Sequence, residues 1–208
     1  MNRSLSPSRR LLGVLVAAPF IVAACSTDSD STEPDEATAA ATETAVVEAA
    51  PDVAVETAAE RPAYLDVELT DAATGETFTL ASLEGEVVAI EPMAIWCSNC
   101  KAQQNNVKEA YSDIADAGVT YISLGIDPGE NEDALARYAD RNEFGWTFVK
   151  SPAELSRELS DLFGPQILSA PSTPLIVLDA NGDVFTQEWG FHGPDSLLSI
   201  LGEAADAA

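Results

Sequence analysis

Apolar and polar positions from about residue 62 onward follow a repeating order of strand-like and helix-like patterns. Residues 64–70 and 76–80 largely alternate apolar with polar side chains around a turn at residues 72–75, which predicts an N-terminal β-hairpin. The apolar runs that follow are short, as in strands buried within a sheet. Five further strands are predicted, at residues 87–91, 119–126, 146–149, 175–178 and 184–189.

Helical patterns with recognisable start and stop signals separate these strands. Asn131 can cap one helix, and Gly118 and Gly164 can end two others. Helices are predicted at residues 98–117, 132–141, 151–162 and 195–202. Strands that alternate with helices, closed by a hairpin and a final helix, imply an α/β fold with a mixed central β-sheet flanked by helices.

Residues 1–24 have the pattern of an export signal peptide. Three arginines precede or border an apolar stretch at residues 11–24, and no acidic residue occurs before Asp28. The stretch is short for a membrane span, which needs about 20 residues. An uncleaved N-terminal anchor and a plain secretory signal are the alternatives, and Ser8-Arg9-Arg10 partly matches a twin-arginine export signal.

Residues 25–61 have a different composition, dominated by Ala, Thr, Ser, Val and acidic residues. They include no aromatic residue and no basic residue before Arg61. Such a segment buries too little apolar surface to offset its chain entropy, so we expect a disordered acidic tether. A partly helical stalk is the alternative, which Pro34 and Pro51 disfavour. Residues 62–208 then form one domain of ordinary size.

The chain is strongly acidic, with 35 Asp and Glu residues against 10 Lys and Arg residues and a formal net charge of −25. This balance argues against nucleic acid and against anionic lipid headgroups as binding partners. It is compatible with a high-salt habitat, where ions screen self-repulsion, and equally with an acidic surface that aids solubility.

The candidate chemistry lies in a Cys-x-x-Cys pair, Cys97 and Cys100, between a predicted strand and a predicted helix. The first cysteine stands at the helix N-terminus, where free backbone N–H groups and the helix dipole favour a thiolate. Two intervening residues allow a short disulfide to close and reopen. The pattern predicts reversible thiol–disulfide exchange, with Cys97 attacking and Cys100 resolving.

With these elements and motifs in place, residues 62–208 resemble the thioredoxin superfamily, and within it the membrane-tethered TlpA/ResA-like proteins. The resemblance rests on Trp96-Cys97-Ser98-Asn99-Cys100, on Ser172-Thr173-Pro174 before an apolar strand, and on the added hairpin and strand–helix segment. It implies a thioredoxin-like fold with an N-terminal β-hairpin and an inserted strand–helix segment at about residues 130–163.

The resemblance also implies roles for residues around the cysteines. Thr173-Pro174 would be a cis peptide bond that faces the dithiol and receives a client strand, whereas Pro165 and Pro171 are the other candidates among the loop prolines. Glu91, six residues before Cys97, would be a buried acid that carries the proton of the resolving cysteine.

Three neighbours of the cysteines complete the implied site. Trp96 would pack beside the sulfurs and shield them, while Ser98 and Asn99 would tune the reduction potential. Lys101 could stabilise a thiolate, although a solvated helix face suits it better. Pro92 departs from the family pattern, and because proline cannot donate to a sheet ladder, we expect the strand to bulge or end there.

A second resemblance concerns the end of the predicted signal. Val22-Ala23-Ala24-Cys25 resembles the bacterial lipobox, which implies cleavage before Cys25 and lipidation of that cysteine. Cys97 and Cys100 are then left as a matched pair among three cysteines. The implied location is the outer face of the cytoplasmic membrane, held by a lipid anchor.

Together, the two resemblances imply an extracytoplasmic protein-disulfide reductase. Its clients would be exported proteins such as apocytochrome c or copper-site proteins, and its electrons would come from a transmembrane thiol carrier. We expect a monomer without cofactor, resident metal or nucleic acid. A disulfide-forming oxidase or isomerase is the alternative, and a non-catalytic binding module is a more distant one.

Two other activities compete with this interpretation. Copper chaperones of the SCO type share the fold and use two cysteines and a histidine; His192 is the single histidine, but the cysteine spacing is one residue short. A zinc site would lack a second cysteine pair. Peroxiredoxins need threonine three residues before the reactive cysteine, where this chain has Ala94.

Overall fold

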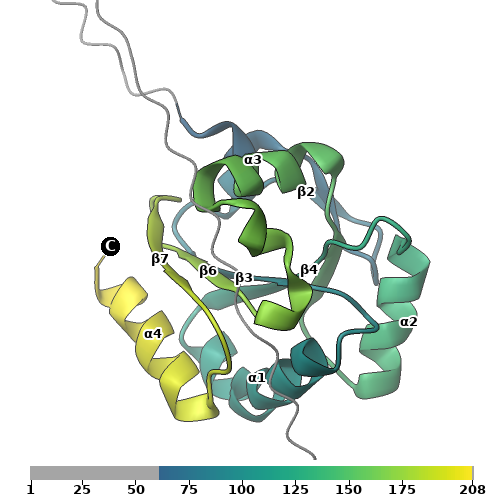
Figure 1. The fold of residues 1–208 in the computed structure, drawn as a ribbon. Coiled ribbons are helices and arrows are strands. Elements are labelled where there is room, and N and C mark those ends of the chain that lie inside the picture. The colour runs from purple at the N-terminus through teal and green to yellow at the C-terminus, as the bar shows by residue number, and fades with distance from the viewer. Residues whose placement is uncertain (1–60, 208) are drawn as a thin grey trace, which may run out of the picture. The chain divides into compact units, whose positions relative to one another are not determined.

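The computed structural model describes residues 61–207, which fold around a five-stranded mixed sheet in the order β5-β4-β3-β6-β7 (Figure 1). The strands β3, β4 and β5 are parallel, and β6 and β7 add antiparallel neighbours beyond β3. The bounds of the strands are Val87–Met93 (β3), Val119–Gly125 (β4), Thr147–Lys150 (β5), Leu175–Leu178 (β6) and Val184–Glu188 (β7). This arrangement confirms the predicted thioredoxin-like α/β class.

Helices cover both faces of the sheet. Buried side chains of α1, α2 and α4 share one core cluster with one face, and those of α3 share a second cluster with the other. Figure 1 shows α1 and α4 side by side below the sheet, with α3 above it. The bounds of the helices are Ser98–Asp116 (α1), Glu132–Asn142 (α2), Ala153–Phe163 (α3) and Pro194–Asp206 (α4).

Side chains of the central strands divide between the two clusters by their alternation. In β3, Ala89 and Met93 pack toward α1, whereas Val88 and Ile90 pack toward α3. Because both faces are covered, the strand is a nearly continuous apolar run rather than an alternating one. The predicted positions of β3 to β7 and α1 to α4 agree with the structure to within a few residues at each end, and Asn131 caps α2 as expected.

The N-terminal hairpin is present but shorter than predicted. Its strands are Leu69–Thr70 (β1) and Thr77–Phe78 (β2), which pair antiparallel. The 3-10 helices η1 (Ala63–Asp66) and η2 (Leu80–Leu83) take the place of the rest. Neighbouring Tyr64 and Leu65 are both buried, a pattern that a strand with one buried face cannot satisfy, so the alternation at residues 64–66 was misleading.

The strand β3 continues through Pro92, where we expected a bulge or an end. Met93 O accepts from Ile126 N on the β4 side, so the backbone of Pro92 faces the β6 side. Pairing between β3 and β6 covers Val88 to Ile90, so the ladder has ended before the proline. Pro92 therefore costs no ladder hydrogen bond.

The predicted signal peptide, Cys25 and the tether lie outside the described residues. Of the helices between residues 61 and 207, none is long and apolar enough to cross a membrane. Two more 3-10 turns, η3 (Pro165–Leu168) and η4 (Ala170–Ser172), connect α3 to β6 and were not predicted.

Candidate functional site

Cys97 and Cys100 form a disulfide at the N-terminus of α1, with their Cα atoms 5.3 Å apart. Cys97 is the N-cap residue, and its Sγ accepts the backbone N–H of Cys100 at 3.1 Å. A sulfur that accepts this bond at a helix N-terminus is favoured as a thiolate once the disulfide is reduced. The geometry therefore matches the attacking role predicted for Cys97.

The segment that contains η4 covers the disulfide. Ala170 O lies 3.1 Å from Cys100 Sγ, and Asn99 Nδ2 donates to Pro171 O at 2.9 Å. Both cysteines are buried, Cys100 completely. On reduction the Cys100 thiol has the Ala170 carbonyl within reach as a hydrogen-bond acceptor. Ser98, by contrast, is exposed to solvent at the end of the helix.

Thr173 and Pro174 follow this segment directly and are both buried. Thr173 has φ 45° and ψ 59°, a left-handed conformation that is unusual for a β-branched residue. Its N–H donates to Ala170 O at 3.0 Å. That N–H is thus engaged inside the loop in this structure, so a client strand would have to displace it. The cis geometry and the client-binding role stay predictions.

Glu91 is buried, with 1% of its surface exposed, and lies on the sheet face that α1 covers. Tyr121 Oη and Ser123 Oγ approach Glu91 Oε2 at 3.3 and 3.4 Å, while Oε1 has no hydrogen-bond partner. Burial raises the pKa of Glu91 to about 8, and hydrogen bonds from Tyr121, Ser123 and Gln104 offset part of that rise. A carboxyl group in this pKa range can exchange a proton with a thiol near neutral pH.

A chain of polar side chains extends from Glu91 across the core. Gln104, one turn after Cys100 on α1, donates from Nε2 to Ser123 Oγ at 3.4 Å and accepts from Tyr138 Oη at 2.7 Å. Trp146 Nε1 also donates to Ser123 Oγ, at 2.9 Å. Gln104 therefore links the helix of the dithiol to the surroundings of the buried acid.

Trp96 is largely exposed and bonded to a neighbouring loop, and its role as a shield for the sulfurs stays a prediction. Its side chain is 62% exposed, and its indole N–H donates to Asp127 Oδ2 on the loop between β4 and α2. This bond is the main cause of a lowered pKa at Asp127. The hydrogen bond holds the ring against the loop between β4 and α2, while Ala170 contacts Cys100 Sγ directly.

A groove of about 210 Å³ lies beside the disulfide, between Trp96 and the segment that contains η4. Its walls are mostly apolar. The lining residues are Ala94, Trp96, Ile126, Asp127, Pro128, Leu168, Ser169, Ala170 and Pro171. Trp96 directly precedes Cys97 in the chain, and Ala170 contacts Cys100 Sγ, so the groove lies next to residues that flank the disulfide.

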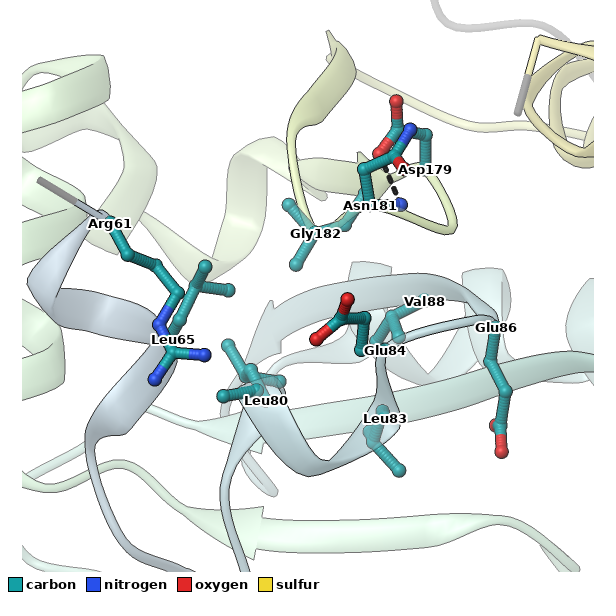
Figure 2. Close-up of a pocket in the computed structure, with 12 residues that line it drawn as sticks. Arg61, Leu65, Leu80, Leu83, Glu84, Glu86, Val88, Asp179, Asn181 and Gly182 are labelled. Carbon is teal, nitrogen blue, oxygen red and sulfur yellow. Dashed lines mark hydrogen bonds between the residues drawn. The ribbon is translucent and has the colours of Figure 1, made fainter. Parts of the chain in front are cut away.

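A second cavity, between η1, η2 and the turn from β6 to β7, is unrelated to the dithiol. Figure 2 shows Leu65, Leu80 and Gly182 facing it, with the Asn181 N–H bonded to Asp179 Oδ1 at 2.9 Å. Its volume is about 20 Å³, enough for about one water molecule and too small for a peptide or cofactor.

His192, the candidate third metal ligand, is held through its backbone rather than through its ring. Gln103 Oε1 accepts from His192 N at 2.8 Å, and Gln103 Nε2 and Asn106 Nδ2 donate to His192 O. Among residues 61–207, no three His, Cys, Asp or Glu side chains are grouped so that they could hold a metal ion. The geometry gives the SCO-type alternative no support.

Sequence reasoning missed several residues that the fold brings to the site. Gln104, Asp127, Glu130 and Ala170 were not singled out, because their types are common and their distance along the chain from Cys97 varies from 7 to 73 positions. A polar residue one helical turn after Cys100 was the one local signal available, and it points to Gln104.

Comparison with known proteins agrees with this geometry. The chain is 30% identical to nucleoredoxin from Bos taurus over 115 residues, which cover 55% of this chain and 25% of nucleoredoxin. It is 28% identical to the thiol-disulfide oxidoreductase ResA from Oceanobacillus iheyensis over 129 residues, or 62% of each protein. The chain thus spans a quarter of the first relative and under two thirds of the second.

Solved structures support the fold. A thiol:disulfide interchange protein of the thioredoxin family from Chlorobium tepidum superposes with a TM-score of 0.54 at 18% identity, covering 66% of this chain and 92% of that one. The model of the AhpC/TSA family matches residues 48–185. With its thioredoxin-like fold and its Cys97–Cys100 pair, this chain belongs to the AhpC/TSA family.

Proposed function

We propose that this protein is an extracytoplasmic thiol–disulfide oxidoreductase that reduces disulfides of exported client proteins. The observation that carries the proposal is the Cys97–Cys100 disulfide at the N-terminus of α1, together with a buried acid of raised pKa on the sheet face that this helix covers. The named activity of the relative ResA is of the same kind.

The reaction begins with the reduced protein. The Cys97 thiolate attacks one sulfur of a client disulfide, so that a Cys97–client bond forms, the client S–S bond breaks and the other client sulfur leaves as a thiolate that takes a proton from water. Cys100 then loses its proton toward Glu91 and attacks Cys97 Sγ. The bond between Cys97 and the client breaks, and the second client sulfur leaves as a thiolate that takes a proton from water. The client then has two reduced thiols, and the protein keeps the Cys97–Cys100 disulfide. Two electrons pass to the client.

The proton transfer in the second step gives the buried carboxyl group of Glu91 a function. A thiol has an ordinary pKa of about 8.5, close to the pKa of about 8 of Glu91, so a proton can pass from the thiol to the ionised carboxylate at little cost in free energy. Gln104 joins the surroundings of Glu91 to the helix that carries Cys100. A water molecule could bridge the remaining gap between the acid and the thiol.

The groove beside Trp96 is where a client chain would approach. Its apolar walls fit the side chains next to a client cysteine, and the carbonyls of Ala170 and Pro171 lie at its edge near the sulfurs. The disulfide itself is buried, and its chain neighbour Trp96 and its contact Ala170 line this groove, so a donor that reduces it would approach through the same groove. Client and electron donor would therefore compete for one surface.

The roles of the two cysteines can be tested by trapping. Full-length Cys100→Ser should accumulate a mixed disulfide with a client protein, because the attack occurs and the release does not. Cys97→Ser should form no adduct. Gel shift under non-reducing conditions, followed by release with dithiothreitol, measures both. Equal trapping by the two variants would contradict the assignment.

The direction of electron flow is tested by the reduction potential of the pair, measured on the full chain in thiol buffers. A value near or below about −250 mV, in the thioredoxin range, supports a reductase supplied by a membrane thiol carrier. A value near about −120 mV, in the range of the oxidant DsbA, would make the protein a disulfide donor instead. Consumption of peroxide faster than of disulfides would favour a peroxidase, the alternative that Ala94 disfavours.

The location rests on the sequence of residues 1–25. We expect Cys25→Ala to be released from the membrane fraction or to stay unprocessed, because the lipid attachment point is lost. Fractionation shows whether the variant leaves the membrane fraction, and a mass measurement of the N-terminus shows whether it is processed. Normal membrane retention of a cleaved Cys25→Ala protein would rule out lipidation.

A further inference from the structure

The loop between β4 and α2, residues 126–130, forms hydrogen bonds with the end of β3 and with two residues of the short segment that leads from it to Cys97. Ile126 N donates to Met93 O at 2.9 Å, and Ile95 N donates to Glu130 Oε1 at 2.7 Å. The indole of Trp96 bonds to Asp127. Because residues 94–97 leave the sheet, their backbone has no strand partner, and this loop takes the place of one.

Glu130 differs from the other contacts of this loop because its carboxylate is inside the protein. It is 8% exposed, and its Oε2 is buried with no hydrogen-bond partner. Asp127 and Lys150 are the charges that shift its pKa, and Lys150 Nζ is already bonded to the carbonyls of Gly125 and Asp127. A buried carboxylate with an orphaned oxygen requires an explanation beyond stability.

We propose that Glu130 is a positioning residue for thiol–disulfide exchange: by accepting the Ile95 N–H, it holds the Ala94–Cys97 turn that sets where Cys97 Sγ lies. The proposal rests on the proposed exchange activity. Cys97 N donates to Ala94 O at 3.0 Å and closes the turn. A shift of this turn moves the N-cap sulfur away from the Cys100 N–H that it accepts.

Position matters because the attacking sulfur must align with the two sulfurs of the disulfide that it cleaves. Displacement of a reacting atom by about 1 Å can cost about 10²-fold in rate. Loss of the Cys100 N–H bond would also raise the pKa of the Cys97 thiol, since that bond favours the charged form. Glu130 would thus act on Cys97 through the backbone, without touching a client.

A test must distinguish the effect of the negative charge of Glu130 from the effect of the length of its side chain. Burial raises its pKa, with Asp127 adding to the rise and the Ile95 N–H and Lys150 opposing it. Its charge also raises the pKa of Tyr138, though less than burial and Glu91 do. Glu130→Gln keeps an oxygen at the same distance from Ile95 N–H and removes the charge. Glu130→Asp keeps the charge, but its side chain is one methylene group too short to reach the Ile95 N–H.

The experiment compares these two variants in the reduced full-length protein. The measurements are the pH profile of Cys97 alkylation by iodoacetamide, which yields the thiol pKa and limiting rate, and the rate of exchange with glutathione disulfide. Glu132→Ala, which removes an exposed carboxylate from the start of α2, is the matched control. Urea unfolding of each variant ensures that rates are compared for folded protein.

Glu130→Asp should slow exchange by about tenfold or more and raise the pKa of the Cys97 thiol, whereas Glu130→Gln should stay close to wild type. Slowed exchange in folded Glu130→Gln would assign the role to charge and overturn the proposal. Unchanged exchange in folded Glu130→Asp would overturn it as well. If wild type exchanges with glutathione disulfide but reduces no protein disulfide, the client function fails while the comparison at Glu130 stands.

Discussion

At the scale of single residues, the burial of Glu91 costs free energy of folding and also gives its carboxyl group a pKa suited to proton transfer. Its carboxyl group is buried in the middle of the sheet, where one oxygen has long hydrogen bonds and the other has none. Burial favours the protonated form, so the folded protein holds a proton that the unfolded chain releases near pH 4.5. The same residue can therefore be detected in a stability measurement as well as in a kinetic one.

We predict that the free energy of unfolding of the oxidised protein falls as the pH rises from about 4.5 to about 8, because in that window the folded state binds one proton more at Glu91. The contribution of Glu91 is fully present below about pH 4.5 and lost above about pH 8. It amounts to at most about 1.4 kcal/mol per pH unit. Urea unfolding at pH 5, 6, 7 and 8 measures it.

Glu91→Gln should remove this part of the pH dependence, because the amide does not titrate. Glu109→Gln, which replaces an exposed carboxylate on α1, is the control and should leave the slope as in wild type. Identical slopes for wild type and Glu91→Gln would mean that the carboxyl group titrates normally in the folded protein.

At the scale of elements, the end of β4 shows how closely a strand and a helix must approach to place the loop at residues 126–130. Gly125, the last residue of β4, faces Leu135 of α2. A Cβ atom at Gly125 would lie 2.9 Å from both methyl groups of Leu135 and 3.4 Å from Glu130 Oε2. Leu135 is fully buried, so it has little room to move. The glycine is needed for this close packing.

Gly125→Ala should therefore destabilise the protein by about 1–3 kcal/mol through overpacking. Gly145→Ala is the matched control, because a Cβ atom there meets only Tyr111 at 3.5 Å, an ordinary contact. Thermal or urea unfolding compares the two. A Gly125→Ala protein as stable as Gly145→Ala would show that α2 can shift at no cost.

At the scale of the whole molecule, the chain has a formal charge of −25, and few ion pairs form within the part of it that the structure describes. Within residues 61–207 the salt bridges are Arg61–Asp66 and Lys108–Glu143, both at the surface. Exposed pairs contribute little to stability. Screening by salt therefore weakens repulsion more than attraction, which stabilises the folded state.

We expect the melting temperature of the full chain to rise by a few degrees between 0.05 and 1 M NaCl, since about 1 kcal/mol corresponds to about 2–8 °C in domains of this size range. Differential scanning calorimetry measures the shift. KCl should act equally if screening is the cause. A melting temperature that falls with salt would mean that attractive ion pairs dominate.

The sequence by itself determined the order of the elements and the local part of the site. The strand β3, the following helix and the Cys-x-x-Cys pair between them are recognisable because apolar periodicity and helix ends are properties of neighbouring residues. The placement of Cys97 at the N-cap of α1 followed from that pattern, whereas the burial of Glu91 was implied by the family resemblance.

Only the tertiary structure decided which distant residues meet the dithiol. The contact of Ala170 with Cys100 Sγ spans 70 positions, and that of Glu130 with Ile95 N spans 35. The exposed orientation of Trp96 depends on Asp127, which is 31 positions away. Residue types alone do not encode such contacts, because they depend on how loops of different length pack over the ends of the sheet strands.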